Sequence, residues 1–248
     1  MRASLVIAIA IGSLCSGGCG KPKGEAVLPE QNTDFAQLFA TNCSGCHGVD
    51  GRSGPAPRLN DPLFLAFIDR QSLHDVVANG RQGTPMPAFA RSSGGFLNAV
   101  QVNALVDGME SRWARPVKLN GVTMPVYSAS NAPPGDAARG QVAYQRNCMM
   151  CHGFGKFKGM AGSVTDPSFL GLISDQNLRT TIVVGRPDWG MPDWRYRIPR
   201  HVMSDQDISD VVAWLSSQRP KTAIEAAPTP RQTSAESQAS APQENDQK

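Results

Sequence analysis

The chain of 248 residues contains six cysteines and four histidines, and most of them lie in two copies of one heptad. The first copy reads NCSGCHG at residues 42–48, and the second reads NCMMCHG at residues 147–153. The spacing Cys-x-x-Cys-His therefore occurs twice. Two thiols followed by an imidazole can bind a metal ion, form a redox-active pair or a disulfide, or attach a prosthetic group covalently.

Covalent attachment of haem gives a role to both parts of the motif. Each thiol can add across a haem vinyl group, and the adjacent histidine then becomes a ligand of the iron. A zinc site with four cysteines would leave His47 and His152 without a role. A redox-active Cys-x-x-Cys is expected near a βαβ pattern, which is absent, and a disulfide does not require a histidine at the same offset twice. The pattern favours haem attached at Cys43, Cys46, Cys148 and Cys151.

The two heptads are part of a longer internal repeat with a shift of 105 residues. The segment NDPLFLAFIDRQSL at 60–73 aligns with TDPSFLGLISDQNL at 165–178 without a gap. Gly80-Arg81 and Met86-Pro87 then align with Gly185-Arg186 and Met191-Pro192. The sequence therefore predicts a duplicated domain.

Two methionines occupy equivalent positions in this repeat. Met86 lies 39 residues after His47, and Met191 lies 39 residues after His152. A single methionine is usually core filler, but two at one register, each followed by proline in a loop, favour ligation of iron by the thioether sulfur. The remaining candidates, Met124, Met160 and Met203, have no twin and are interpreted as filler or surface residues.

The elements that position these residues are predicted to be helices. Apolar residues three and four apart, with glycine stops and an N-cap pair at Ser204 and Asp207, mark the helices. The expected helical segments are 33–42, 71–80 and 101–109 in the first repeat and 138–147, 176–185 and 206–215 in the second. The fold class is therefore all-α, with long loops.

Each half resembles class I (mitochondrial-type) cytochromes c, over roughly residues 33–112 and 136–219. The resemblance implies two tandem domains of that fold, two haem c groups, and axial iron ligands His47, Met86, His152 and Met191. In that family a proline carbonyl accepts the ring N–H of the histidine, a role that falls to Pro57, whereas the second half has Gly162 there. His74 and His201 are interpreted as surface histidines, and Phe39 and Tyr144 as the place where opening and closing helices cross.

The expected organisation follows from these motifs and from composition. Residues 114–134 are rich in Pro, Asn and Ser, and the tail has almost no large apolar residue, which favours disorder. The predicted divisions are an export or lipoprotein signal at 1–19, a tether at 20–32, a first domain at 33–113, a linker at 114–134, a second domain at 135–220 and a disordered tail at 221–248.

The first residues predict export from the cytoplasm. A short apolar run from Leu5 to Leu14 is followed by small residues directly before Cys19, as at a bacterial lipoprotein cleavage site. Ser16 stands where such sites normally have leucine, and a plain cleaved signal is the alternative. The expected location is the periplasmic side of the cytoplasmic membrane, with a lipid anchor on Cys19.

The predicted function is single-electron transfer, without enzymatic activity of its own. Histidine and methionine fill both axial positions and leave no open site for a substrate. The expected donor is a quinol-oxidising complex or a dehydrogenase, and the expected acceptor is a terminal oxidase or reductase. A two-haem peroxidase is the alternative, and methionine at both sites counts against it. The 24 basic and 21 acidic residues form no basic block, so nucleic acid is not an expected partner.

Overall fold

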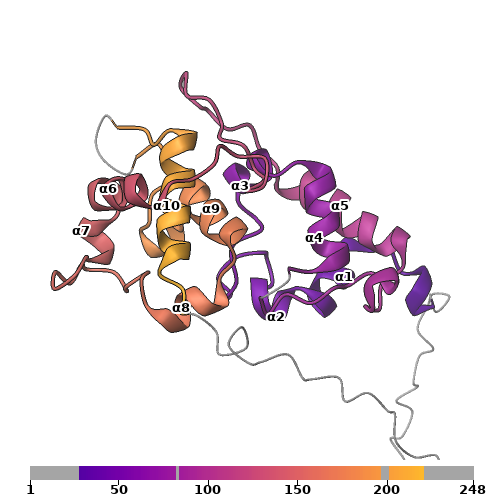
Figure 1. Ribbon diagram of the computed structural model, residues 1–248. Helices are drawn as coiled ribbons and strands as arrows, with labels where there is room; N and C mark the ends of the chain where they lie inside the picture. Colours follow the sequence, from indigo (N-terminus) through magenta and orange to yellow (C-terminus); the bar gives the residue numbers. More distant parts are fainter. Residues whose placement is uncertain (1–27, 82–83, 197–200, 221–248) are drawn as a thin grey trace, which may run out of the picture.

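The structure, a computed structural model, describes residues 28–81, 84–196 and 201–220 (Figure 1). These residues form two helical bodies, one from each repeat, and within them the only β-pairing consists of isolated bridges. The predicted all-α class is confirmed. Most of the region predicted as signal and tether, including Cys19, and the predicted tail lie outside the described residues. Among the described helices, none has the length and hydropathy that a bilayer-spanning segment requires.

The two repeats have the same order of helices. The first contains α1 (Phe35–Asn42), α2 (Ser44–His47), α3 (Pro62–Phe67), α4 (Arg70–Asn79) and α5 (Ala99–Trp113). The second contains α6 (Ala137–Asn147), α7 (Met149–His152), α8 (Pro167–Leu172), α9 (Asp175–Val184) and α10 (Asp205–Ser217). Short 3₁₀ helices cover Pro29–Gln31, Arg91–Ser93 and Pro187–Trp189. The six predicted helices are present, and α5 extends beyond its predicted end.

Side-chain caps determine where most of these helices begin. The Ser204 side chain accepts from the Asp207 backbone N–H, and the Asp207 carboxylate accepts from the Ser204 N–H, so the predicted N-cap pair is a capping box. Helices α3 and α8, which sequence reasoning did not single out, begin in the same way as each other. Asp61 and Asp166 each accept two backbone N–H groups, and a proline follows at the first helical position.

The opening and closing helices of each domain pack together, α1 with α5 and α6 with α10. At this crossing each domain pairs an aromatic residue with a glycine. The aromatic residue lies on the opening helix in the first domain and on the closing helix in the second. In the first domain Phe35 of α1 fills the space at Gly108 of α5, where an added Cβ would lie 2.0 Å from the phenylalanine ring. In the second domain Gly140 of α6 faces Trp214 of α10, and its Cβ would lie 1.9 Å from the Asp210 carbonyl oxygen. Gly140 aligns with Phe35 and Trp214 with Gly108 in the repeat.

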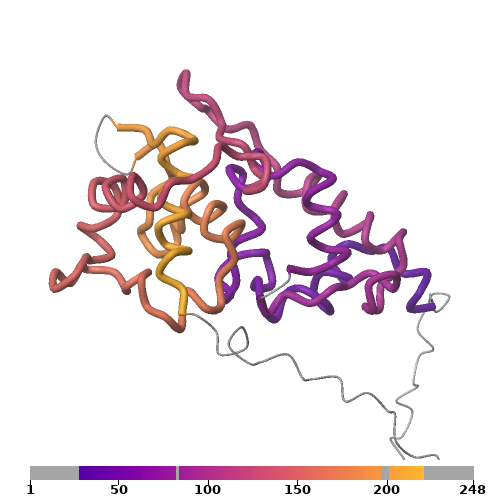
Figure 2. Tube along the Cα trace, viewed as in Figure 1, coloured from indigo at the N-terminus to yellow at the C-terminus, as the bar shows by residue number. Residues whose placement is uncertain are grey.

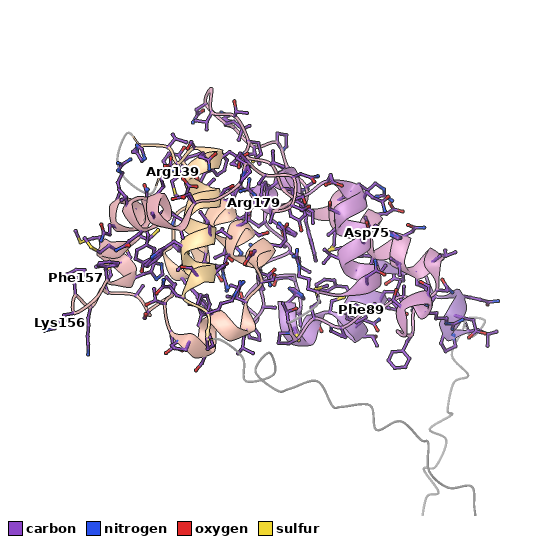
Figure 3. All side chains as sticks on the ribbon, viewed as in Figure 1. Asp75, Phe89, Arg139, Lys156, Phe157 and Arg179 are labelled. Carbon is purple, nitrogen blue, oxygen red and sulfur yellow. The ribbon has the colours of Figure 1, made fainter. Side chains whose placement is uncertain are left out.

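Residues 114–134, the proposed linker, form no helix or strand and are packed against both domains (Figure 2). The buried side chain of Arg179 in α9 (labelled in Figure 3) donates from Nε to the Val126 carbonyl over 2.7 Å and pairs with Asp205. Gln176 Nε2 donates to the Tyr127 carbonyl over 2.8 Å. These bonds satisfy backbone groups that a helix or strand would otherwise satisfy.

The two domains also touch directly. Helix α3 of the first domain packs against α9 of the second. Leu63 and Phe67, on α3, are buried within the hydrophobic core of the second domain. The loop that carries Pro57 and Arg58 lines one small cavity together with Arg186 and Pro187 of the second domain. The relative placement of the domains therefore rests on buried apolar contacts as well as on the linker.

The helix crossing predicts that Gly140→Ala destabilises the second domain by about 2 kcal/mol, because the new methyl group forces α6 away from α10. Urea unfolding of the full haem-loaded chain, followed by tryptophan fluorescence, measures this change. Gly171→Ala in α8 is the matched control, since nothing lies within 4 Å of its Cβ position, and helix propensity alone makes it neutral or stabilising. Equal stability of the two variants would contradict the packing described.

Candidate haem-binding sites

Each Cys-x-x-Cys-His segment forms one short helical turn directly after the opening helix. Cys43 ends α1 and begins α2, with φ −120° and ψ −33°. Cys148 does the same between α6 and α7, with φ −127° and ψ −33°. Residues i, i+3 and i+4 of a helix share one face. The two thiols and the histidine of each motif therefore lie on one side of the turn, as attachment to one planar ring requires.

Glycines allow the following loop to fold back closely onto the motif. Gly48 and Gly153 end the two turns with φ of 80° and 79°, a region that favours glycine. A Cβ on Gly54 would lie 2.2 Å from the Cys46 carbonyl oxygen, and one on Gly159 would lie 2.2 Å from that of Cys151. The Cys46 carbonyl accepts from the Ala56 backbone N–H over 3.0 Å, and the Cys151 carbonyl accepts from the Ala161 backbone N–H over 2.7 Å.

This fold-back brings a backbone carbonyl to each histidine ring. His47 Nδ1 lies 2.8 Å from the Pro57 oxygen, and His152 Nδ1 lies 2.9 Å from the Gly162 oxygen. The carbonyl accepts the Nδ1–H, which fixes the tautomer and leaves Nε2 able to bind a metal. The proline-based resemblance did not extend to Gly162, yet the contact is present, because any residue type supplies the carbonyl.

The electrostatic surroundings suit a neutral imidazole ligand. Burial lowers the pKa of His47, the hydrogen bond to Pro57 opposes this effect, and the positive charge of Arg81 lowers the pKa further. Burial, together with the neighbouring Cys46, raises the pKa of the Cys43 thiol to about 12. A redox-active dithiol requires a lowered thiol pKa, so this site does not fit that alternative.

The methionine loops are pressed against the ends of α4 and α9. Both helices end at a glycine with positive φ, Gly80 at 70° and Gly185 at 75°. A Cβ there would lie 2.6 Å from the carbonyl oxygen of Met86 or Met191, respectively. Both methionine side chains are half-buried. Only glycine therefore permits this close approach of helix end and loop.

Backbone hydrogen bonds close each loop. Arg81 N–H donates to the Met86 oxygen over 3.0 Å, and Arg186 N–H donates to the Met191 oxygen over 2.9 Å. Met191 N–H also donates back to Arg186 over 3.0 Å, whereas Met86 N–H donates to the Thr84 hydroxyl over 3.3 Å. In each repeat the predicted methionine thus lies in a turn that a backbone hydrogen bond from an equivalent arginine closes.

The residues present fit a covalently bound haem better than a protein-bound metal ion. Among the described residues, no group of three or more His, Cys, Asp or Glu side chains is placed to hold a metal, so the four cysteines form no shared zinc site. The donor set of two thiols, an imidazole and a thioether in each repeat suits haem c.

The methionines and histidines without twins have other surroundings. Met203 is buried and Met124 packs against the second core, whereas Met160 is 88% exposed. His74 Nδ1 lies 3.5 Å from the Asp75 carboxylate. The His201 Nε2 atom is buried and has no partner among the described residues.

Sequence reasoning missed the hydrogen bonds of two tyrosines near these sites. The Tyr144 hydroxyl donates to the Gly153 carbonyl over 2.8 Å and so ties α6 to the end of the second motif. The Tyr127 hydroxyl, in the linker, accepts from the Arg81 guanidinium over 2.7 Å. The position of Tyr144 next to the motif was a signal for the first contact, whereas no local pattern indicated the second.

Comparison with known proteins gives a consistent result for both repeats. The chain is 29% identical over 186 residues to the cbb3-type cytochrome c oxidase subunit FixP of Bradyrhizobium diazoefficiens, covering 71% of this chain and 59% of that protein. It is 27% identical over 178 residues to FixP of Rhizobium etli, covering 66% and 54%. The chain therefore spans between half and two thirds of the length of these two relatives.

Two further matches are weaker or shorter. FixP of Bradyrhizobium sp. strain ORS 278 is 40% identical over 57 residues, which is 22% of this chain and 19% of that protein. A chain of the Kuenenia stuttgartiensis reducing HAO-like protein complex Kustc0457/Kustc0458 aligns at 17% identity over 79% of this chain and 98% of its own. The TM-score of this alignment is 0.40.

The family assignment rests on the repeat itself. The model of one family, described as cytochrome c oxidase, cbb3-type, subunit III, matches the chain twice, over residues 30–107 and 135–215. Each match contains one Cys-x-x-Cys-His turn and one methionine loop, and together they span well over half of the chain. With its tandem class I cytochrome c domains, the chain belongs to the family of cytochrome c oxidase, cbb3-type, subunit III.

Proposed function

We propose that the chain is a two-haem electron carrier, with one haem c on each repeat. Cys43 and Cys46 would hold the first haem and Cys148 and Cys151 the second. The axial ligands would be His47 with Met86 and His152 with Met191. The main observation behind the proposal is that two structural features occur in both repeats. The motif histidine contacts a backbone carbonyl, and the methionine turn packs against a glycine at a helix end.

The residues of this chain perform the positioning in such a carrier. Bound haem supplies an iron that takes up and releases one electron. Pro57 and Gly162 orient the histidine rings through their carbonyls, and Gly80 and Gly185 hold the methionine backbones close to the helix ends. A histidine and a methionine held in this way would need little rearrangement during electron transfer, which favours that function over chemistry on a bound substrate.

Family membership and the relatives' names support a proposal about the partners. Those relatives are subunits of cbb3-type cytochrome c oxidases. We infer that this chain passes electrons to a terminal oxidase, either as a subunit of a complex or as a tethered carrier. A quinol-oxidising complex or a dehydrogenase would be the donor. One haem facing the donor and the other facing the acceptor would give the duplication a function.

The location proposed is the periplasmic side of the bacterial cytoplasmic membrane. The apolar run and small residues before Cys19 support export and a lipid anchor at that cysteine. We predict that the mature protein begins at a diacylated Cys19 and sediments with membranes. Cys19→Ser should release it into the periplasmic fraction, whereas Cys15→Ser should not. Mass analysis of the mature N-terminus measures this, and an unmodified N-terminus in the soluble fraction of the native host would rule out the anchor.

The axial assignment predicts separate effects of the two methionines. Class I cytochromes c with an iron–methionine bond have a weak far-red absorption band when oxidised. This band should fall by about half in Met86→Ala and by about half in Met191→Ala, and it should vanish in the double variant. Met124→Ala is the control, because Met124 only packs against the second core. A band that survives in the double variant would show that other ligands bind the iron.

The glycine stops predict a different kind of change. Gly185→Ala places a methyl group against the Met191 turn, so the methionine must shift away from its position. We expect this variant to lose most of the far-red band intensity that comes from the second haem site. We also expect its free energy of unfolding to fall by about 2 kcal/mol or more. Gly190→Ala, also at positive φ but with nothing within 4 Å, is the control for backbone strain. An unchanged band in Gly185→Ala would argue against the turn as the positioning device.

A further inference from the structure

Arg81 and Arg186 occupy equivalent positions in the repeat, but their guanidinium groups have different partners. Each backbone N–H donates to the carbonyl of the proposed iron ligand, Met86 or Met191. The Arg186 guanidinium pairs with the Asp188 carboxylate at 3.1 Å and stacks over the Trp189 ring at 3.9 Å. Its charge is therefore neutralised locally by a carboxylate.

No carboxylate of the described residues forms an ion pair with the Arg81 guanidinium. This guanidinium donates over 2.7 Å to the Tyr127 hydroxyl, which is a neutral acceptor. Burial raises the pKa of Tyr127, although the Arg81 charge opposes this effect, and the hydroxyl stays protonated at neutral pH. The Arg81 backbone N–H donates to the Met86 oxygen over 3.0 Å, so the guanidinium is carried by the turn that holds a proposed ligand of the first haem.

Tyr127 itself is fixed by both domains. Its ring packs edge-on against Phe67 of α3, with 5.2 Å between ring centroids. Its carbonyl accepts from Gln176 of α9 over 2.8 Å, and Gln176 Oε1 accepts from the Ala129 N–H over 2.8 Å. Contacts with both domains therefore fix the position of the hydroxyl.

We propose that Tyr127 is a positioning residue for the first haem site, where its hydroxyl holds the Arg81 guanidinium beside the His47–Met86 ligand pair and thereby raises the midpoint potential. A positive charge near iron disfavours the more positive, oxidised state. Because the equivalent charge at Arg186 is paired, the effect is specific to the first site. Docking of the second domain thus influences the potential of the first haem. This inference rests on the two-haem function proposed above.

The test is a redox titration of the full haem-loaded chain, with both midpoints resolved and the first assigned as the one that Met86→Ala moves. Arg81→Gln should lower the reduced-to-oxidised ratio of the first haem by about threefold to tenfold at a fixed ambient potential. Tyr127→Phe, which keeps the ring against Phe67, should lower the ratio in the same direction by about twofold to fivefold. Arg186→Gln is the matched control and should move neither midpoint by as much as Arg81→Gln moves the first.

The double variant gives the test of coupling. If Tyr127 acts through Arg81, then adding Tyr127→Phe to Arg81→Gln changes the first midpoint no further. Arg81→Lys, which keeps the charge, should retain part of the potential that Arg81→Gln loses. Additive shifts, an unchanged first midpoint in both single variants, or loss of the far-red methionine band in Tyr127→Phe would each overturn the inference. A haemochrome assay showing no covalent haem would instead overturn the proposed function.

Discussion

A hydrogen bond from the motif histidine to a backbone carbonyl ten residues downstream is the interaction on which both sites depend. It uses Nδ1 and so leaves Nε2 as the one ring nitrogen able to bind iron. The contact forms only if the loop turns back sharply. Gly54 and Gly159 allow this turn because they lie directly against the carbonyls of Cys46 and Cys151, respectively. The histidine of the five-residue motif is therefore oriented by the loop that follows it, through a carbonyl ten residues further along the chain.

The second constraint acts from the other end of each domain. The helices α4 and α9 end on glycines that touch the methionine turns, so a helix anchored in the core sets the position of the loop. Both repeats have these glycine contacts, whereas the residues around them differ between the repeats. Phe35 with Gly108 and Gly140 with Trp214 fill the same helix crossing in opposite senses, and Arg81 and Arg186 have different partners. Two sites with one ligand frame can therefore differ in stability and in potential.

Much of this architecture was predictable because the repeat doubles each signal. The cysteine spacing, the methionine register and the apolar stripes of the closing helices predicted a tandem all-α fold, which the structure confirms. The contact at Gly162 was not foreseen, because a backbone carbonyl leaves no trace in residue type. The role of residues 114–134 was also missed. Arg179 aligns with His74, which was interpreted as a surface histidine. Arg179 is nevertheless 1% exposed and binds the linker, a contact between segments 53 residues apart.

The most direct measurement is a mass spectrum of peptides from the mature protein, isolated from its native host. The account predicts that the peptide containing Cys43 and Cys46 and the peptide containing Cys148 and Cys151 each carry one haem through two thioether bonds. Bare thiols or disulfides at these four cysteines would contradict it, because the histidine and methionine turns would then have no iron to bind.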